Sequence, residues 1–251
     1  VALGLEAVNI PVDDRTRFQP TPDHLDQSGA PLDGLILANP SNPTGSMIPD
    51  ETLGELVVGC QQRGIRLISD EIYHGITSSW KPRTVAAMSE DAFIINSFSK
   101  YFSMTGWRLG WMILPEAALR AVECLTQNLF ISPPTLSQIA ACAVFDCTEE
   151  LEGNVARYAA NRELLLNALP EAGFTKLAPA DGAFYIYADI AHLTNDSEDF
   201  CRRMLQETGV AATPGIDFDP ERGDHFMRFS IAGATDDMAE AARRLKNWLQ
   251  K

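Results

Sequence analysis

The chain has 251 residues and a formal net charge of −14 at pH 7, and hydrophobic residues make up 45% of it. This composition is typical of a folded globular protein and excludes an intrinsically disordered one. The acidic charge argues against nucleic acids and anionic membranes as partners, because both are bound by basic surfaces, and the apolar runs fall short of the roughly 18 residues that a membrane span needs.

Short apolar runs alternate with a helical pattern through the first 115 residues. We predict strands over residues 35–38, 65–69, 92–96 and 109–114, a further strand over 7–10, and a helix from Asp50 to Gly64. Helical crossovers between strands predict a mostly parallel sheet. The run at 109–114 follows its predecessor too closely for such a crossover, so we expect it to pair antiparallel.

From Pro115 onward helices predominate, with short strands between them. We predict helices over residues 116–128, 135–147, 150–169, 197–207 and from Thr235 to about Gln250, and strands over 184–187 and 226–231. Thr235 is expected to cap the last helix. The predicted fold class is therefore α/β, with a large domain over residues 1–148 that holds the parallel sheet and a smaller α+β domain over residues 149–251.

The chain has five cysteines, an odd number, and no C-x-x-C pair. This usage is typical of buried free thiols in a reducing compartment, so we expect a cytoplasmic protein. A zinc site would need about four clustered ligands, and the sequence has no such cluster. We therefore expect no metal site.

Polar sequences follow three successive predicted strands. They are Asn-Pro-Ser-Asn-Pro-Thr-Gly at 39–45, Asp-Glu-Ile-Tyr at 70–73, and Ser-Phe-Ser-Lys at 97–100, with Arg108 beyond. Each alone has an ordinary explanation as a turn, a helix cap, a solvated lysine or a surface ion pair. Ligands of open α/β sheets bind outside the carboxyl ends of the strands, so the order and spacing of the three sequences favour one shared site for carbonyl chemistry.

Taken together, N-P-x-N-P-T-G, D-E-x-Y and S-x-S-K followed by Arg108 resemble the class I/II aminotransferases, which are pyridoxal-phosphate enzymes of fold type I. The segment 99–111 is similar to the lysine region of that family nearly throughout. The resemblance extends from about residue 35 to the C-terminus. It implies a pyridoxal 5'-phosphate cofactor bound by the large domain.

The resemblance also implies three catalytic residues, Lys100, Asp70 and Tyr73. Lys100 would form the Schiff base with the cofactor and then move a proton at the substrate α-carbon. Asp70 would face the pyridine nitrogen and keep it protonated, which makes the ring an electron sink. Tyr73 and Asn42 would both hydrogen-bond the phenolic oxygen of the ring.

The remaining residues implied by the resemblance bind anions. Arg108 would clamp the cofactor phosphate through two parallel N–H contacts, and Ser97 and Ser99 would assist it. Arg228, in the predicted strand 226–231, resembles the family's arginine for the substrate α-carboxylate, and Asn42 would join it there; the ordinary alternative for Arg228 is a surface ion pair.

The implied function is an aminotransferase of amino acid metabolism that moves the amino group of an L-amino acid to a 2-oxo acid. The substrate is poorly encoded, although the absence of arginine and lysine from residues 126–138 disfavours an enzyme specific for aspartate. Two alternatives remain open. One is a C–S β-lyase or another reaction on the same fold, and the other is a non-catalytic, aminotransferase-like regulatory module.

Members of this family have a further N-terminal stretch, with a phosphate-binding loop and an aromatic residue that stacks on the ring. Residues 1–34 offer no counterpart of either feature. We therefore expect the chain to be the C-terminal part of a homodimeric enzyme. By itself, the 251-residue piece is expected to bind the cofactor loosely and to have little activity.

Overall fold

The structure is a computed structural model that describes residues 4–27, 29, 31–78 and 80–250. Contacts divide the chain into two compact units. The first comprises Val1–Asn39, Met47–His74 and Lys81–Asp146, and the second comprises Pro40–Ser46, Gly75–Trp80 and Cys147–Lys251. Each unit has its own sheet and its own core. The domain boundary that the sequence predicts between residues 148 and 149 stays a prediction.

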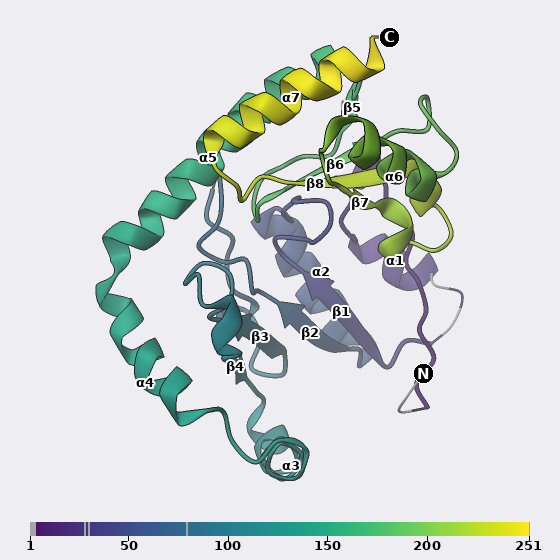
Figure 1. Cartoon of the computed structure of the whole chain (residues 1–251). Helices are drawn as coiled ribbons and strands as arrows, with labels where there is room; N and C mark the ends of the chain where they lie inside the picture. Colours follow the sequence, from purple (N-terminus) through teal and green to yellow (C-terminus); the bar gives the residue numbers. More distant parts are fainter. Residues whose placement is uncertain (1–3, 28, 30, 79, 251) are drawn as a thin grey trace. The chain divides into compact units, whose positions relative to one another are not determined.

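The first unit contains a four-stranded sheet in the order β1-β2-β3-β4 (Figure 1). The strands are β1 (Gly34–Ala38), β2 (Arg66–Asp70), β3 (Phe93–Ser97) and β4 (Gly110–Ile113). β1, β2 and β3 are parallel, whereas β4 pairs antiparallel with β3. The strands predicted over residues 35–38, 65–69, 92–96 and 109–114 are confirmed, as is the antiparallel pairing of the last one.

One face of this sheet is packed against helices α1 (Pro22–Gln27) and α2 (Asp50–Arg63). α2 buries Leu53, Leu56 and Val57 among the residues of β1, β2 and β3 that point to the same side. It ends at Gly64, whose positive φ of 67° lets its N–H bond the carbonyls of Cys60 and Gln61. The predicted helix 50–64 is therefore confirmed.

The rest of the first unit leaves much apolar surface exposed. All four residues of β4 are exposed, and α3 (Glu116–Leu129) buries none of its residues. α4 (Thr135–Ala143) ends earlier than the predicted residue 147, because the chain tightens into a 3₁₀ turn over Val144–Asp146. The strand predicted over residues 7–10 is wrong. Those residues pair with no other strand among the described residues, and without a partner an extended segment forms no sheet.

The second unit contains an antiparallel sheet in the order β5-β6-β8-β7. Its strands are β5 (Lys176–Leu177), β6 (Tyr185–Asp189), β7 (Thr213–Pro214) and β8 (Phe226–Ser230), and its helices are α5 (Thr148–Ala172), α6 (Ser197–Thr208) and α7 (Thr235–Leu249). Residues of all three helices pack with β6 and β8 into one core. The mostly parallel sheet together with this second α+β unit confirms the predicted fold class.

α7 runs alongside the C-terminal half of α5 (Figure 1), and Lys246 pairs with Glu171 near the ends of the two helices. α5 continues through Pro170 to Ala172, three residues beyond the predicted end. The predicted cap of α7 is wrong. Ala234 holds the extended cap conformation, so Thr235 is already helical and its hydroxyl caps nothing. No helix in the described part of the chain has the length and apolar composition needed to cross a membrane.

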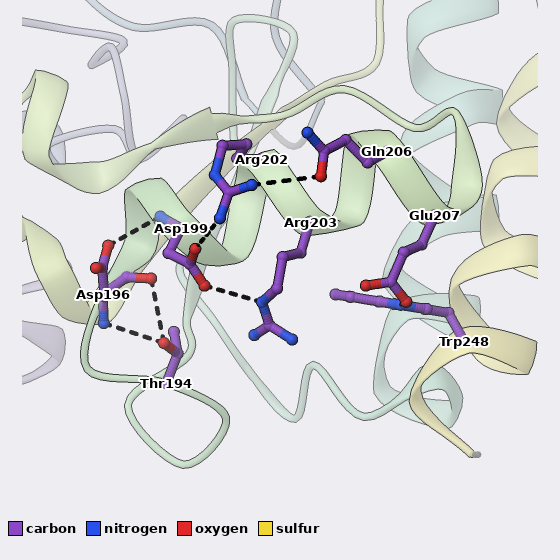
Figure 2. A network of polar contacts seen from close by, with 8 residues as sticks. All are labelled: Thr194, Asp196, Asp199, Arg202, Arg203, Gln206, Glu207 and Trp248. Atoms are coloured by element: carbon purple, nitrogen blue, oxygen red, sulfur yellow. Dashed lines mark hydrogen bonds and ion pairs between the residues drawn. The ribbon is translucent and has the colours of Figure 1, made fainter.

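Hydrogen bonds and ion pairs connect the polar side chains on the surface of α6, as Figure 2 shows. Asp196 caps the helix by accepting the backbone N–H of Asp199 at 2.8 Å. Asp199 in turn binds Arg202 and Arg203 one turn further along. The indole N–H of Trp248 donates to a carboxylate of α6, that of Glu207, at 2.7 Å, so α7 is tied to α6.

Two short loops join the second unit although they follow strands of the first. The backbone N–H of Gly182 donates to the carbonyl of Gly45 at 2.9 Å, and Ala183 does the same to Ile76 at 2.9 Å. Gly45 has a φ of +69°, and a Cβ there would lie 2.8 Å from the carbonyl oxygen of Tyr185. Only glycine fits this position, which explains the last residue of the N-P-x-N-P-T-G motif.

All five cysteines are free, as predicted. Cys60 and Cys201 are buried, but Cys142 is exposed and the other two are half-buried, so the expectation that the thiols are buried holds for two of them. The exposure of a cysteine depends on whether its face of the helix packs on the core. Most residues of α3 and α4, which carry Cys124 and Cys142, are not buried.

Candidate active site

Four of the predicted residues, Asp70, Tyr73, Ser97 and Lys100, meet at the carboxyl edge of the first unit's sheet. Asp70 ends β2 and Ser97 ends the neighbouring parallel strand β3, so the residues that follow each strand lie on the same edge. There Lys100 places its Nζ 5.5 Å from the ring centroid of Tyr73. An ammonium at this distance from an aromatic face is attracted to it. The sheet therefore brings an amine and a phenol together with a carboxylate.

Asp70 is half-buried, and its side chain accepts the backbone N–H of Ile72 at 3.1 Å. Burial raises the pKa of its carboxyl, while the Ile72 N–H and the charge of Lys100 lower it and the neighbouring Glu71 raises it further. Desolvation is the largest of these influences. A cationic or protonated partner would therefore stabilise the ionised form of this carboxylate.

Glu71 and His74 stabilise the loop that carries Asp70 and Tyr73, and sequence reasoning did not find either of them. Glu71 is 2% exposed and accepts the backbone N–H of Val85 at 2.8 Å and the hydroxyl of Ser69 at 3.1 Å. His74 Nδ1 lies 3.5 Å from the same carboxylate, and burial lowers the pKa of this histidine. The sequence carries no signal for this role, because an acidic residue after a strand is more often exposed.

The turn between β3 and β4 holds the residues predicted to bind phosphate. The hydroxyl of Ser97 accepts the backbone N–H of Ser99 at 3.0 Å and donates to the carbonyl of Leu109 at 3.3 Å. Arg108 has a φ of +53°, uncommon for a residue other than glycine, and its guanidinium donates to the carbonyl of Thr105 at 2.9 Å. Arg108 is exposed and forms no ion pair within the described part of the chain, so it has donors left for an anion.

Asn42 and Arg228 both belong to the second unit, where they form a cluster of their own. Arg228 donates from Nη1 to Asn42 Oδ1 at 2.6 Å and from Nη2 to Thr213 Oγ1 at 3.2 Å. Its Nε is buried and makes no hydrogen bond in the described residues. The surface ion pair that would explain Arg228 otherwise is not found among the described residues. The cluster therefore offers an uncompensated cation beside an amide.

A hollow of about 580 Å³ lies at the opposite edge of the first unit's sheet. It is lined by residues at the starts of β2 and β3, such as Arg66 and Phe93, and by α2 and the first turns of α3. The predicted site residues lie at the other ends of these strands. We therefore do not place the chemistry in this hollow.

The donor set of the first unit fits pyridoxal phosphate. Lys100 is an amine able to hold an aldehyde, and the half-buried carboxylate of Asp70 suits a protonated ring nitrogen. Tyr73 offers a phenol, while Arg108 and the serines of the turn offer donors for a phosphate.

Comparison with known proteins identifies the family. Residues 2–245 match the family model described as aminotransferase class I and II. The chain is 51% identical to the valine–pyruvate aminotransferase of Mycobacterium tuberculosis, over 99% of this chain and 65% of that protein. It is 35% identical to the (5-formylfuran-3-yl)methyl phosphate transaminase of Methanocaldococcus jannaschii, over 86% of this chain and 58% of that one.

A solved aminotransferase structure from Mycobacterium tuberculosis has the same fold, with a TM-score of 0.96 and 50% identity over 99% of this chain and 65% of that one. The chain belongs to the class I and II aminotransferases, which confirms the predicted family. It spans less than two thirds of the length of the two curated relatives, 65% of one and 58% of the other. The two curated relatives are named for different substrates, so membership of the family does not by itself specify one.

Proposed function

We propose that this protein is a pyridoxal-phosphate-dependent aminotransferase, which moves the amino group of an L-amino acid to a 2-oxo acid. The observation that carries the proposal is the meeting of Lys100, Tyr73 and Asp70 at one sheet edge in a chain of this family. An amine is a base that can move a proton at an α-carbon, and a half-buried carboxylate and a phenol beside it can bind the ring nitrogen and the phenolic oxygen of the cofactor.

When bound, pyridoxal phosphate supplies a carbonyl that takes up the amino group and a ring that accepts the electrons of the α-carbon. In our proposal Lys100 holds the cofactor through its amine and then moves the α-proton. Asp70 keeps the ring nitrogen protonated, for which its desolvated carboxylate is suited. Tyr73 and Asn42 donate to the phenolic oxygen.

The anion-binding roles follow the same reasoning. Arg108 binds the phosphate in the plane of its guanidinium, with Ser97 and Ser99 as further donors. Arg228 binds the substrate α-carboxylate together with Asn42. In support, Arg228 forms no ion pair in the described part of the chain, and its buried Nε has no hydrogen-bond partner there. Because every α-amino acid carries this carboxylate, Arg228 sets the substrate class and leaves the choice of side chain open.

For the substrates we propose valine or a similar apolar L-amino acid as donor and pyruvate as acceptor. The support is the activity for which the relative at 51% identity is named. The absence of arginine and lysine from residues 126–138 agrees with a donor that has no side-chain carboxylate. We also propose that the enzyme is a cytoplasmic homodimer. Its free cysteines agree with a reducing compartment, and the exposed apolar side chains of α3 and α4 could pack against a second subunit.

The test is a donor and acceptor panel with the holoenzyme. Valine with pyruvate should give alanine and the branched 2-oxo acid, faster than aspartate with 2-oxoglutarate. Cystathionine without any acceptor should release no pyruvate, and pyruvate release would identify the β-lyase alternative. No transfer with any pair, by a holoenzyme that binds the cofactor, would favour the regulatory module.

A further inference from the structure

Aromatic rings contact the charged group of Arg228 in addition to its two hydrogen-bond acceptors. The guanidinium carbon lies 4.2 Å from the ring centroid of Tyr185 and 4.6 Å from that of Phe218. At these distances the positive guanidinium is attracted to the face of an aromatic ring, which carries partial negative charge. Stacked contacts leave the N–H groups in the guanidinium plane free to bind oxygen, which is the geometry that a carboxylate requires.

Phe218 reaches Arg228 from a tightly closed loop. The backbone N–H groups of Phe218 and Asp219 both donate to the carbonyl of Gly215, at 2.9 and 3.0 Å. A Cβ on Gly215 would lie 2.7 Å from the carbonyl oxygen of Phe226 and would clash with that of Gly223, so the loop has little room to rearrange. The ring of Phe218 is therefore held at a defined place beside the guanidinium.

Tyr185 is part of the packed core of its unit and is 7% exposed, whereas Phe218 is half-buried and comes from the loop. A change at Tyr185 would disturb the core as well as Arg228. A change at Phe218 removes the ring contact with less disturbance. Phe218 is therefore the position at which the contribution of the rings can be isolated.

We propose that Phe218 is a positioning residue for substrate recognition, which holds the guanidinium of Arg228 ready for the α-carboxylate. The inference rests on the proposed function, which assigns Arg228 to that carboxylate. Arginine side chains lose considerable rotamer freedom when they bind, and a residue that orders the side chain beforehand removes part of this cost. Loss of the ring should weaken carboxylate binding by about 3- to 30-fold, the range of a partly buried cation–π contact.

The experiment measures binding of 3-methylbutanoate, which is valine without its amino group, to the holoenzyme by calorimetry. Its uncharged amide, 3-methylbutanamide, has the same shape and no carboxylate. The variants are Phe218→Leu, which removes the ring, and Phe218→Tyr, which retains it. The matched control is Phe226→Leu, because the ring of Phe226 is also half-buried, lies two residues from Arg228 and stacks on Tyr187 at 5.1 Å.

We expect Phe218→Leu to weaken binding of the acid about 3- to 30-fold, with Phe218→Tyr and Phe226→Leu close to the parent enzyme and binding of the amide unchanged. KM should rise in parallel for all amino acids and 2-oxo acids, and kcat should stay within about twofold. If Phe218→Leu lowers the melting temperature, Phe218→Met fills the space without a ring and is interpreted in the same way.

Unchanged binding of the acid by Phe218→Leu would overturn the inference. Equal weakening by Phe226→Leu, or parallel weakening for the amide, would also overturn it, because either result indicates general loosening of the unit. The variant Arg228→Gln distinguishes a wrong role for Phe218 from a wrong role for Arg228, which belongs to the proposed function. If that variant binds 3-methylbutanoate as tightly as the parent, then Arg228 does not bind the carboxylate at all. If it loses binding while Phe218→Leu keeps it, only the role of Phe218 is wrong.

Discussion

Two isoleucines in the middle of their strands have opposite surroundings. Ile186 on β6 of the second unit is 0% exposed, whereas Ile36 on β1 of the first unit is 76% exposed. β6 is buried along almost its whole length, while β1 alternates buried and exposed residues because the described helices cover one face of its sheet. Parallel sheets are usually covered on both faces. Within this chain, the second unit therefore completes its core and the first unit does not.

The same two units also differ in chemistry. The first contains the amine, phenol and half-buried carboxylate at one sheet edge, where the charge of the amine lowers the pKa of the carboxyl. The second contains a cation, Arg228, that forms no ion pair with any described residue and is held by an amide, a hydroxyl and two rings. The unit with the less complete core thus carries the reactive groups, and the well-packed unit carries a binding group. This division suggests that substitutions in the first unit affect turnover most and substitutions in the second affect affinity and stability.

The largest effect is expected from Asp70→Asn in the first unit. The amide cannot keep the ring nitrogen protonated, so kcat should fall about 10³-fold, which corresponds to about 4 kcal/mol of activation free energy. Cofactor affinity should change far less, because the phosphate contacts remain. Steady-state kinetics and a cofactor titration of the same preparation measure both quantities. Near-normal turnover would show that Asp70 does not face the ring nitrogen.

An intermediate effect, on stability, is expected when an isoleucine is replaced by alanine at one position in each unit. Ile186→Ala should lower the free energy of unfolding by about 3 kcal/mol, because it leaves a cavity in a closed core. Ile36→Ala should lower it by less than about 0.5 kcal/mol, because the side chain is already in water. Urea unfolding of the 251-residue chain measures both. Equal losses at the two positions would mean that the exposed face of β1 is covered in solution.

The smallest effect concerns the stability of the apoprotein with Asp70→Asn. Burial raises the pKa of this carboxyl in the folded state, so its ionised form destabilises the fold at any pH above that pKa. The substitution should therefore raise the melting temperature slightly at pH 7. The gain should disappear as the pH falls below about 4, where the carboxyl is protonated in both the folded and unfolded states. A gain that persists at pH 3 would require a cause other than charge.

The sequence predicted the four strands of the first sheet, β6 and β8 of the second sheet, and the polar residues that follow β1, β2 and β3, because apolar runs and short connections reflect local rules. It did not predict the two-residue strands β5 and β7. The antiparallel direction of β4 followed from its short connection to β3 in this way. It could not predict which polar groups meet, since these contacts depend on packing between distant segments. The buried carboxylate of Glu71 is one example, and the ring of Phe218 beside Arg228 is another.

Two of the wrong predictions, the strand at residues 7–10 and the cap at Thr235, have the same origin. The strand predicted at residues 7–10 had an apolar pattern but no partner strand among the described residues. The cap predicted at Thr235 had the right residue type, but the helix begins at that residue and so the cap position falls on Ala234. In both cases the residue types favoured the predicted structure, but the position of the neighbouring segment determined whether it formed.

The central claim is that the first unit holds the cofactor through Lys100, and one measurement tests it directly. Borohydride reduction of the holoenzyme fixes pyridoxal phosphate to the lysine that holds it, and mass spectrometry of a digest identifies that lysine. We expect the added mass on the peptide that contains Lys100, with loss of the visible absorbance of the cofactor. The same mass on another lysine, such as Lys81 or Lys176, would contradict the account.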